Sequence, residues 1–171
     1  MLGIIIVSCS DDAEEPTVNK TNSFTVDDTE YSLSEGLTLE YGGDATTGYN
    51  FDLYVYSSGI DVSGILDSGF AGAGGVAGTG EVLYFELWST SATGLASGTY
   101  AISLSEAPNT YTVSELAINF GESSLNVYEA TAGTVNISKD GSTYSINFDL
   151  TVTGGKAFTG NYTGTLPNFL D

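Results

Sequence analysis

Apolar and polar residues alternate with a period of two through most of this chain, and no other feature restricts the fold as much. The clearest example is the segment 143–152, in which every second residue is large and apolar: Tyr144, Ile146, Phe148, Leu150 and Val152. Such alternation is typical of a strand with one buried face, because successive side chains point to opposite sides of the backbone. The pattern predicts an all-β protein.

Turn-forming residues separate the predicted strands in the C-terminal third. Asp140-Gly141 stands between two alternating segments, and this dipeptide is one of the strongest signals for a two-residue hairpin turn. Gly154-Gly155 then leads into a third segment around Phe158 and Tyr162. We therefore predict a three-stranded antiparallel meander at the C-terminal end.

Shorter alternating segments cover the rest of the chain, at 24–26, 31–33, 37–41, 50–57 and 82–89. Residues 114–120 fit either a strand or one short helical turn. About ten short strands with Gly, Asn and Asp turns favour an antiparallel β-sandwich, with a closed up-and-down β-barrel as the alternative. The Gly-rich segment 69–80 contains a G-x-G-x-x-A match but no βαβ context, so we expect a surface loop there.

The N-terminus carries a targeting signal. Cys9 is the only cysteine, and it follows the apolar run 1–8 directly and precedes acidic residues. An apolar segment that ends in small or branched residues before a cysteine is typical of a bacterial lipoprotein, in which the lipid is attached to the thiol of that cysteine. No Lys or Arg lies in the run, so we expect a basic segment upstream of Met1. The predicted organisation is a signal peptide remnant (1–8), a lipidated acidic tether (9–20) and one β-domain (21–171).

Cys9-Ser10-Asp11-Asp12, followed by Glu14 and Glu15, resembles the surface-exposed lipoproteins of the Bacteroidetes. In that group an acidic cluster after the lipidated cysteine is associated with export to the outer leaflet. The segments 133–138 and 161–166 are similar to the C-terminal β-meander of small lipoproteins of the same group. The resemblance implies an outer-membrane location at the cell surface, and it brings no catalytic residues with it.

Charge and composition exclude several functions. The chain of 171 residues has 22 acids against three lysines, with no arginine or histidine, which gives a net charge of −19. Nucleic acid binding needs cations that neutralise phosphates, so we exclude it. Without histidine, Ser-His-Asp and Cys-His catalysis and histidine-ligated zinc are excluded too. Only carboxylate chemistry is left for an enzyme, with Glu86 and either Asp52 or Asp149 as the best pair.

Two sets of residues are candidates for binding. The strands around residues 54 and 86 share an aromatic and acidic face, which would form a platform for sugar rings or for a partner if the strands were neighbours. The opposing interpretation is that this face is the core of a second layer, because large aromatic side chains are buried on average. The candidate ligand-binding residues are Asp52, Tyr54, Tyr56, Tyr84, Glu86 and Trp88.

Asp27, Asp28 and Glu30 cluster in one predicted turn and could hold Ca²⁺, which prefers carboxylate oxygens. Taken together, the sequence predicts a non-enzymatic, lipid-anchored module that binds an extracellular glycan or a partner protein of an outer-membrane assembly. A structural subunit of a surface fibre or larger complex is the first alternative, and a carboxylate-dependent glycan hydrolase is the second.

Overall fold

The computed structural model describes residues 22–65 and 75–169. The predicted signal peptide, Cys9, the tether and residues 69–74 of the Gly-rich segment lie outside these ranges. The described residues form thirteen strands: β1 (Ser23–Val26), β2 (Thr29–Ser32), β3 (Glu35–Asp44), β4 (Gly48–Tyr56), β5 (Ile60–Asp61), β6 (Ala77–Gly78), β7 (Gly80–Ser89), β8 (Gly98–Ile102), β9 (Thr110–Phe120), β10 (Asn126–Tyr128), β11 (Ala130–Asp140), β12 (Thr143–Val152) and β13 (Lys156–Thr165).

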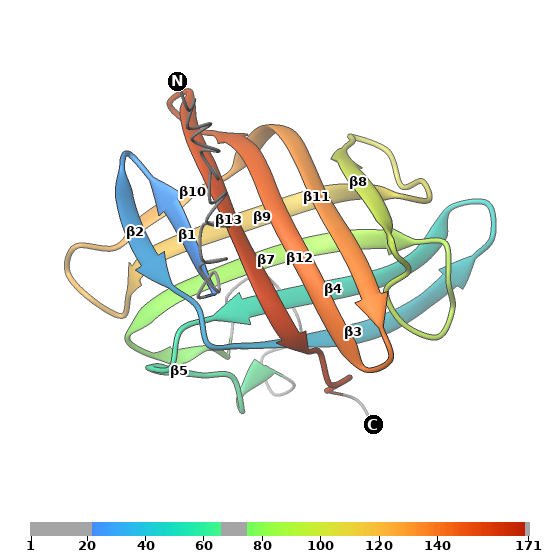
Figure 1. The fold of residues 1–171 in the computed structure, drawn as a ribbon, viewed down its shortest axis with the longest axis horizontal. Coiled ribbons are helices and arrows are strands. Elements are labelled where there is room, and N and C mark those ends of the chain that lie inside the picture. Colours follow the sequence, from blue (N-terminus) through green and yellow to red (C-terminus); the bar gives the residue numbers. More distant parts are fainter. Residues whose placement is uncertain (1–21, 66–74, 170–171) are drawn as a thin grey trace, which may run out of the picture.

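Eleven of these strands belong to one curled sheet, in the order β2-β1-β13-β12-β11-β8-β9-β7-β4-β3, with β10 paired to β9 beside this path. Strands β11, β12 and β13 cross in front of β3, β4, β7 and β9 in Figure 1. The sheet thus folds over on itself and forms a half-barrel. Strands β5 and β6 form a separate two-stranded sheet.

The all-β prediction is confirmed, whereas the predicted division into two sheets is wrong. Strand β8 joins the two halves, because it pairs antiparallel with β11 and parallel with β9. Backbone hydrogen bonding therefore continues from one half to the other, and the parallel pair makes the sheet mixed. The alternative of a closed up-and-down barrel also differs from the observed half-barrel. Residues 114–120 are extended and belong to β9.

The predicted meander is confirmed. Strands β11, β12 and β13 pair antiparallel in sequence order, and Gly141 has a φ of 59° in the turn after Asp140. The opening hairpin of β1 and β2 turns at Asp27 and Asp28, whose φ angles are 49° and 60°. Positive φ at both central positions is the type I′ geometry that suits the right-handed twist of strands.

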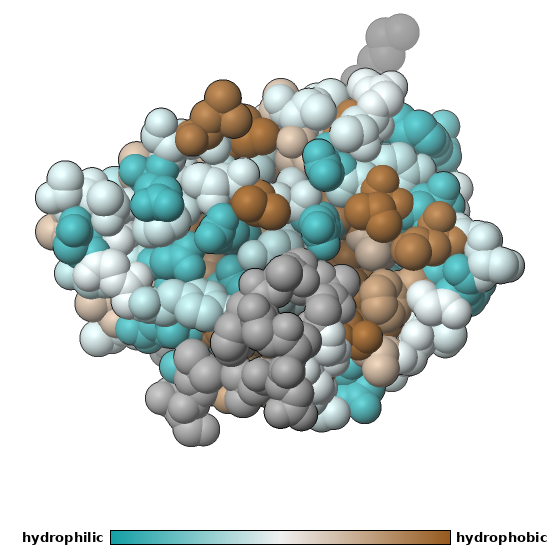
Figure 2. Space-filling model, turned by 180° about the vertical axis from the view of Figure 1, so that it is seen from behind, coloured by the Kyte–Doolittle hydropathy of each residue, from teal (hydrophilic) through white to brown (hydrophobic). Residues whose placement is uncertain are grey.

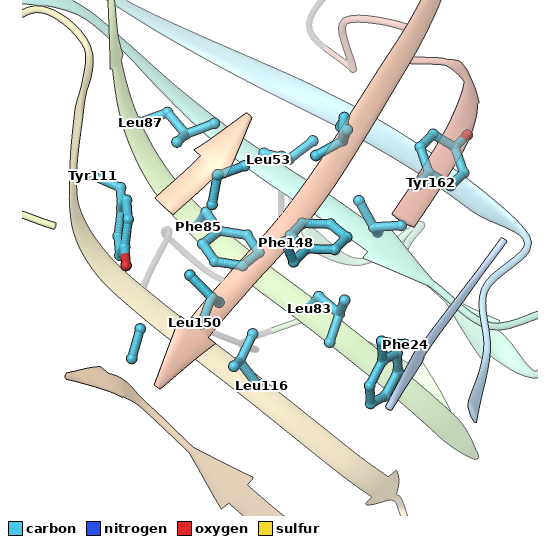
Figure 3. Close-up of a cluster of buried hydrophobic side chains, with 14 of the residues drawn as sticks. Phe24, Leu53, Leu83, Phe85, Leu87, Tyr111, Leu116, Phe148, Leu150 and Tyr162 are labelled. Atoms are coloured by element: carbon cyan, nitrogen blue, oxygen red, sulfur yellow. The ribbon is translucent and has the colours of Figure 1, made fainter. Parts of the chain in front are cut away.

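The main core lies inside the curl. Figure 3 shows Phe85 of β7 and Phe148 of β12 facing each other from opposite halves of the sheet, with Leu53, Leu83 and Leu150 around them. The rings of Phe85 and Phe148 stack with their centroids 5.5 Å apart. Each of these residues occupies the apolar position of an alternating strand, so the period-two pattern is what brings both halves together.

A second, smaller core covers the outer face of β3, β4, β7 and β9. Its buried members are Leu37, Leu39, Tyr54, Tyr56, Ile60, Ile65, Val82, Tyr84 and Ala117. Ile60 and Ile65 come from the segment after β4, which packs back onto the sheet. The strands beneath it are therefore buried on both faces, as the opposing interpretation of the aromatic face expected.

Candidate functional site

The structure brings the predicted aromatic and acidic residues together on neighbouring strands. Strands β4 and β7 pair antiparallel, so that Tyr54 lies opposite Tyr84 and Asp52 lies opposite Glu86. The two tyrosine rings have their centroids 5.0 Å apart. Side chains directly opposite each other on one face of a sheet are in contact range. The shared pattern of the two segments therefore does reflect a shared face.

This face is largely buried. Tyr54, Tyr56 and Tyr84 are 2%, 6% and 7% exposed and belong to the second core, and Trp88 is 8% exposed. The aromatic residues thus do not present an open platform to solvent. The acidic end of the same face is organised differently, because its carboxylates are held in a hydrogen-bonded network.

Asp52 is at the centre of this carboxylate network. The residue is 6% exposed. Its carboxylate accepts hydrogen bonds from the hydroxyls of Tyr84, at 2.9 Å, and Tyr41, at 3.0 Å. Burial raises the pKa of Asp52 to about 6, because the charged form loses hydration, and the tyrosine hydrogen bonds offset only part of this effect. The negative charge of Glu86 raises the pKa further.

Glu86 is held by a second set of donors. Its carboxylate accepts hydrogen bonds from the Thr112 hydroxyl at 2.6 Å and from the Asn50 amide at 3.3 Å. The indole N–H of Trp88 donates to the Thr112 hydroxyl at 3.2 Å, so the only tryptophan is part of the same network. Satisfied polar groups of this kind fix the positions of their partners, which indicates a structural role for both carboxylates.

Two of the hydroxyl donors of this network lie at β-bulges. Tyr41 is the extra residue where the pairing of β3 with β4 shifts, between Glu40 and Gly42. Thr112 is the extra residue of β9 where its pairing with β7 shifts beside Glu86. A bulge changes the local direction of a strand and of its side chains. Tyr41 still lies on the face that its alternation with Leu37 and Leu39 predicts, whereas no sequence pattern marks Thr112.

The third acid of the predicted catalytic set lies elsewhere. Asp149 is on β12, opposite Thr134 of β11 and Thr159 of β13, and it is exposed. Strand β12 does not pair with β4 or β7. Of the proposed acid pairs, the structure therefore places only Asp52 and Glu86 side by side.

Of the predicted calcium-binding residues, Asp27 and Asp28 form the turn between β1 and β2, and Glu30 lies in β2. Asp27 forms an ion pair with Lys156, and Glu30 accepts a hydrogen bond from Ser23 at 2.7 Å. Across the described ranges 22–65 and 75–169, no three acidic side chains are gathered closely enough to hold a metal ion. The turn geometry, in which Asp tolerates positive φ, accounts for the two aspartates.

A groove that the sequence does not predict lies at the seam between β3 and β13. We call it the seam groove; it has a volume of ≈ 380 Å³, and its walls include Glu35, Leu37, Tyr56, Tyr162, Pro167 and Phe169. The Tyr56 hydroxyl donates to the Glu35 carboxylate at 3.4 Å, and Glu35 is exposed. Of the predicted ligand-binding residues, Tyr56 is the one that lines this groove.

The residues after β13 form one wall of the seam groove. They run along β3, where the Thr38 N–H donates to the Pro167 carbonyl at 3.0 Å and the Phe169 N–H donates to the Thr38 carbonyl at 2.8 Å. A parallel bridge joins Thr38 and Asn168. Because this pairing is between segments far apart in sequence, no local pattern predicts the groove.

The opposite side of this tail borders a second hollow, which we call the mouth cavity. It has a volume of ≈ 690 Å³, and its walls include Glu40, Phe51, Thr93, Lys139, Tyr144 and Asn168. Leu166 and Asn168 face the mouth cavity, while Pro167 and Phe169 face the seam groove. Because successive side chains of an extended segment point to opposite sides, residues 166–169 form a wall between the two hollows.

An apolar groove of ≈ 150 Å³ lies beside β10 and includes Phe120, Leu125 and Val127. Leu125 and Val127 are 46% and 53% exposed. Figure 2 shows apolar residues gathered on the side of the molecule where β9 and β10 lie. Phe120 packs against the second core, as Phe169 does, but lines a different groove.

Comparison of the chain with protein-family models, with curated proteins and with solved structures gives no match. In the part of the chain that the structure describes, no helix has the length and hydropathy of a membrane span.

Proposed function

We propose that this protein is a non-enzymatic binding module, held at the bacterial cell surface by a lipid on Cys9, that binds an extracellular glycan in the seam groove. The observation that carries this proposal is a groove that places the partly exposed ring of Phe169 beside an exposed carboxylate, Glu35. Tyr56 and Tyr162, which are 6% and 3% exposed, line the same groove with little open surface.

The groove has the composition that a sugar requires. The C–H face of a sugar ring packs on aromatic and apolar side chains, whereas its hydroxyls need a few polar partners at the edge. Phe169 and Pro167 supply apolar surface, and Glu35 supplies an acceptor that already takes a hydrogen bond from Tyr56. The volume of ≈ 380 Å³ lies within the range of small-ligand sites.

We propose no catalytic step for Asp52 and Glu86. Each carboxylate accepts two hydrogen bonds from neighbouring side chains, and Asp52 is almost fully buried. A glycosidase needs two acids on either side of a cleft that admits the substrate. The network is better suited to holding β3, β4, β7 and β9 together.

An assembly role through free sheet edges is supported less well. Strand β2 ends the sheet on one side, but it has only four residues and includes Glu30. Short and charged edge strands are the usual protection against pairing with another chain. At the other end of the sheet, Thr38 of β3 is already paired with residues 167–169.

Removing the ring of Phe169 is expected to weaken glycan binding about tenfold, because one aromatic contact contributes about 1.5 kcal/mol. A glycan array with the soluble Cys9→Ser chain identifies the best ligand. Titration with that ligand then compares the affinity of this chain with that of the same chain carrying Phe169→Ala. The backbone hydrogen bond from residue 169 to Thr38 is retained in the variant.

The matched control is Phe120→Ala, which removes a similarly placed ring from the second core but leaves the seam groove intact. We expect its affinity to stay within twofold of the parent. Equal losses in the two variants, or no glycan bound by the parent, would contradict a glycan site in the seam groove.

Replacing Cys9 with serine is expected to move the protein from the membrane fraction to the soluble fraction, because the acyl chains that anchor it can no longer be attached. Fractionation of cells that express each variant measures the effect. The neighbouring Ser10→Ala is the control and should stay with the membranes. Persistence of Cys9→Ser in the membrane fraction would refute the lipid anchor.

A further inference from the structure

We propose that the mouth cavity is a second binding site, separate from the seam groove, and that it takes a saccharide bearing a single carboxylate, of the uronate type, with Lys139 binding the carboxylate. This proposal does not depend on a ligand in the seam groove.

The cavity lies at one end of the half-barrel, between β3 and β4 on one side and the hairpin of β11 and β12 on the other. In Figure 1 this hairpin turns beside β3, near the C-terminus. The mouths of barrels are frequent ligand sites, because curled strands surround a hollow that their own side chains do not fill. The volume of ≈ 690 Å³ lies within the range of small-ligand sites.

Lys139 is the reason to expect an anion. The chain has 22 acids and three lysines, so most ammonium groups should find a carboxylate partner. Lys156 does so, with Asp27. Within residues 22–65 and 75–169, no carboxylate lies within ion-pair distance of Lys139. Its ammonium instead lies 4.8 Å from the centroid of the Tyr144 ring, a cation–π contact at the cavity wall.

The other cavity walls indicate a polyhydroxylated ligand. Thr93, Ser142 and Asn168 bring neutral donors and acceptors, whereas Phe51 and Tyr144 are 1% and 6% exposed and add little open surface. Hydroxyl and amide groups around a small apolar area suit the hydroxyl edges of a sugar ring. The carboxylate of Glu40 can accept hydrogen bonds from sugar hydroxyls on the side of the cavity formed by β3.

The charges also restrict the number of negative groups on the ligand. A single lysine is a point charge that matches one carboxylate, whereas phosphate sites usually combine several donors in a fixed geometry. Glu40 in the cavity and the net charge of −19 both repel a multiply charged anion. One negative charge on the whole ligand, as in a saccharide with a single uronate ring, is the best match.

Titration of the purified full-length chain with cellobiouronate, a disaccharide with one uronate ring, tests the proposal, with its methyl ester as the neutral probe. We expect Lys139→Gln to weaken cellobiouronate binding at least tenfold and Lys156→Gln to change it less than twofold. The parent should bind the methyl ester no better than Lys139→Gln binds the acid. Lys139 is exposed, so the glutamine variant keeps the fold, which circular dichroism verifies.

Phe169→Ala separates this site from the seam groove and should retain the affinity for cellobiouronate. Loss of cellobiouronate binding in Phe169→Ala together with full binding in Lys139→Gln would place the acid in the seam groove and overturn the proposal. Absence of binding by the parent at 10 mM probe, or equal affinity of the parent for the acid and its ester, would overturn it as well.

Discussion

Replacing Phe85 with alanine should lower the free energy of unfolding by about 3–5 kcal/mol, the usual cost of removing a large ring from a packed core. Phe85 is fully buried at the centre of the main core. Its ring stacks on Phe148 of β12 and meets the edge of the Tyr111 ring, with centroids 5.5 Å and 5.9 Å apart. The lost stability has two contributions: the free energy gained when the ring is transferred from water into the core, and the cost of the cavity that the ring leaves behind.

Urea denaturation followed by the fluorescence of the single tryptophan measures this loss. The control is Leu104→Ala, because Leu104 is fully exposed and should change stability by less than about 0.5 kcal/mol. A cost below about 1 kcal/mol for Phe85→Ala would mean that the two halves of the sheet do not enclose a common core.

The second large effect is a loss of stability as pH rises through the titration of Asp52. Burial raises the pKa of this carboxyl from its ordinary value of 3.8 to about 6. Between these values the folded state binds more protons than the unfolded state, so the contribution of Asp52 to stability decreases as pH increases. A difference of about two pKa units corresponds to about 3 kcal/mol.

The sign of this effect is opposite to that of an ordinary surface carboxylate in a turn. The contribution of Asp52 is fully present below pH 3.8 and is lost once the pH exceeds about 6. Tyr41, Tyr84 and Glu86 are the groups that face the carboxylate, and the tyrosines stay protonated throughout this range because burial and the acidic neighbours raise their pKa values.

The stability of the parent relative to Asp52→Asn should therefore fall by about 2 kcal/mol between pH 4 and pH 7, which is most of the full effect. Asp44→Asn is the control. Backbone N–H groups of Thr46 and Thr47 lower the pKa of Asp44, so its contribution is lost as pH falls. If the parent and Asp52→Asn had parallel pH profiles, Asp52 would not be titrating from a buried site.

Local patterns were sufficient for much of the fold. The hairpin at Asp140-Gly141 and the meander of β11–β13 follow from two-residue turns and period-two alternation, which act within a few residues. The same patterns place Asp52 and Glu86 on corresponding faces of their strands, and the pairing of β4 with β7 makes them neighbours. When two neighbouring strands both alternate apolar and polar residues, few pairing registers are possible, because a slip of one residue would expose every buried side chain.

The number of sheets could not be predicted, because alternation shows which face of a strand is buried but not which strand lies beside it. The five residues of β8 join the halves through one antiparallel and one parallel pairing. The burial of Tyr54 and Tyr84 depends on Ile60 and Ile65 packing over them from outside the sheet. Donors such as Thr112 depend on a bulge, which inserts one residue against the alternation.

The amino-acid pattern alone thus establishes an acidic all-β chain with a C-terminal meander, since both depend on neighbouring residues or on total charge, and it is the basis for the proposed lipid anchor at Cys9. The two grooves arise only when residues 166–169 pair with β3, more than 120 positions earlier in the chain. Contacts at that separation depend on the closure of the whole sheet, so Phe169 and Lys139 gain their proposed roles only in the folded protein.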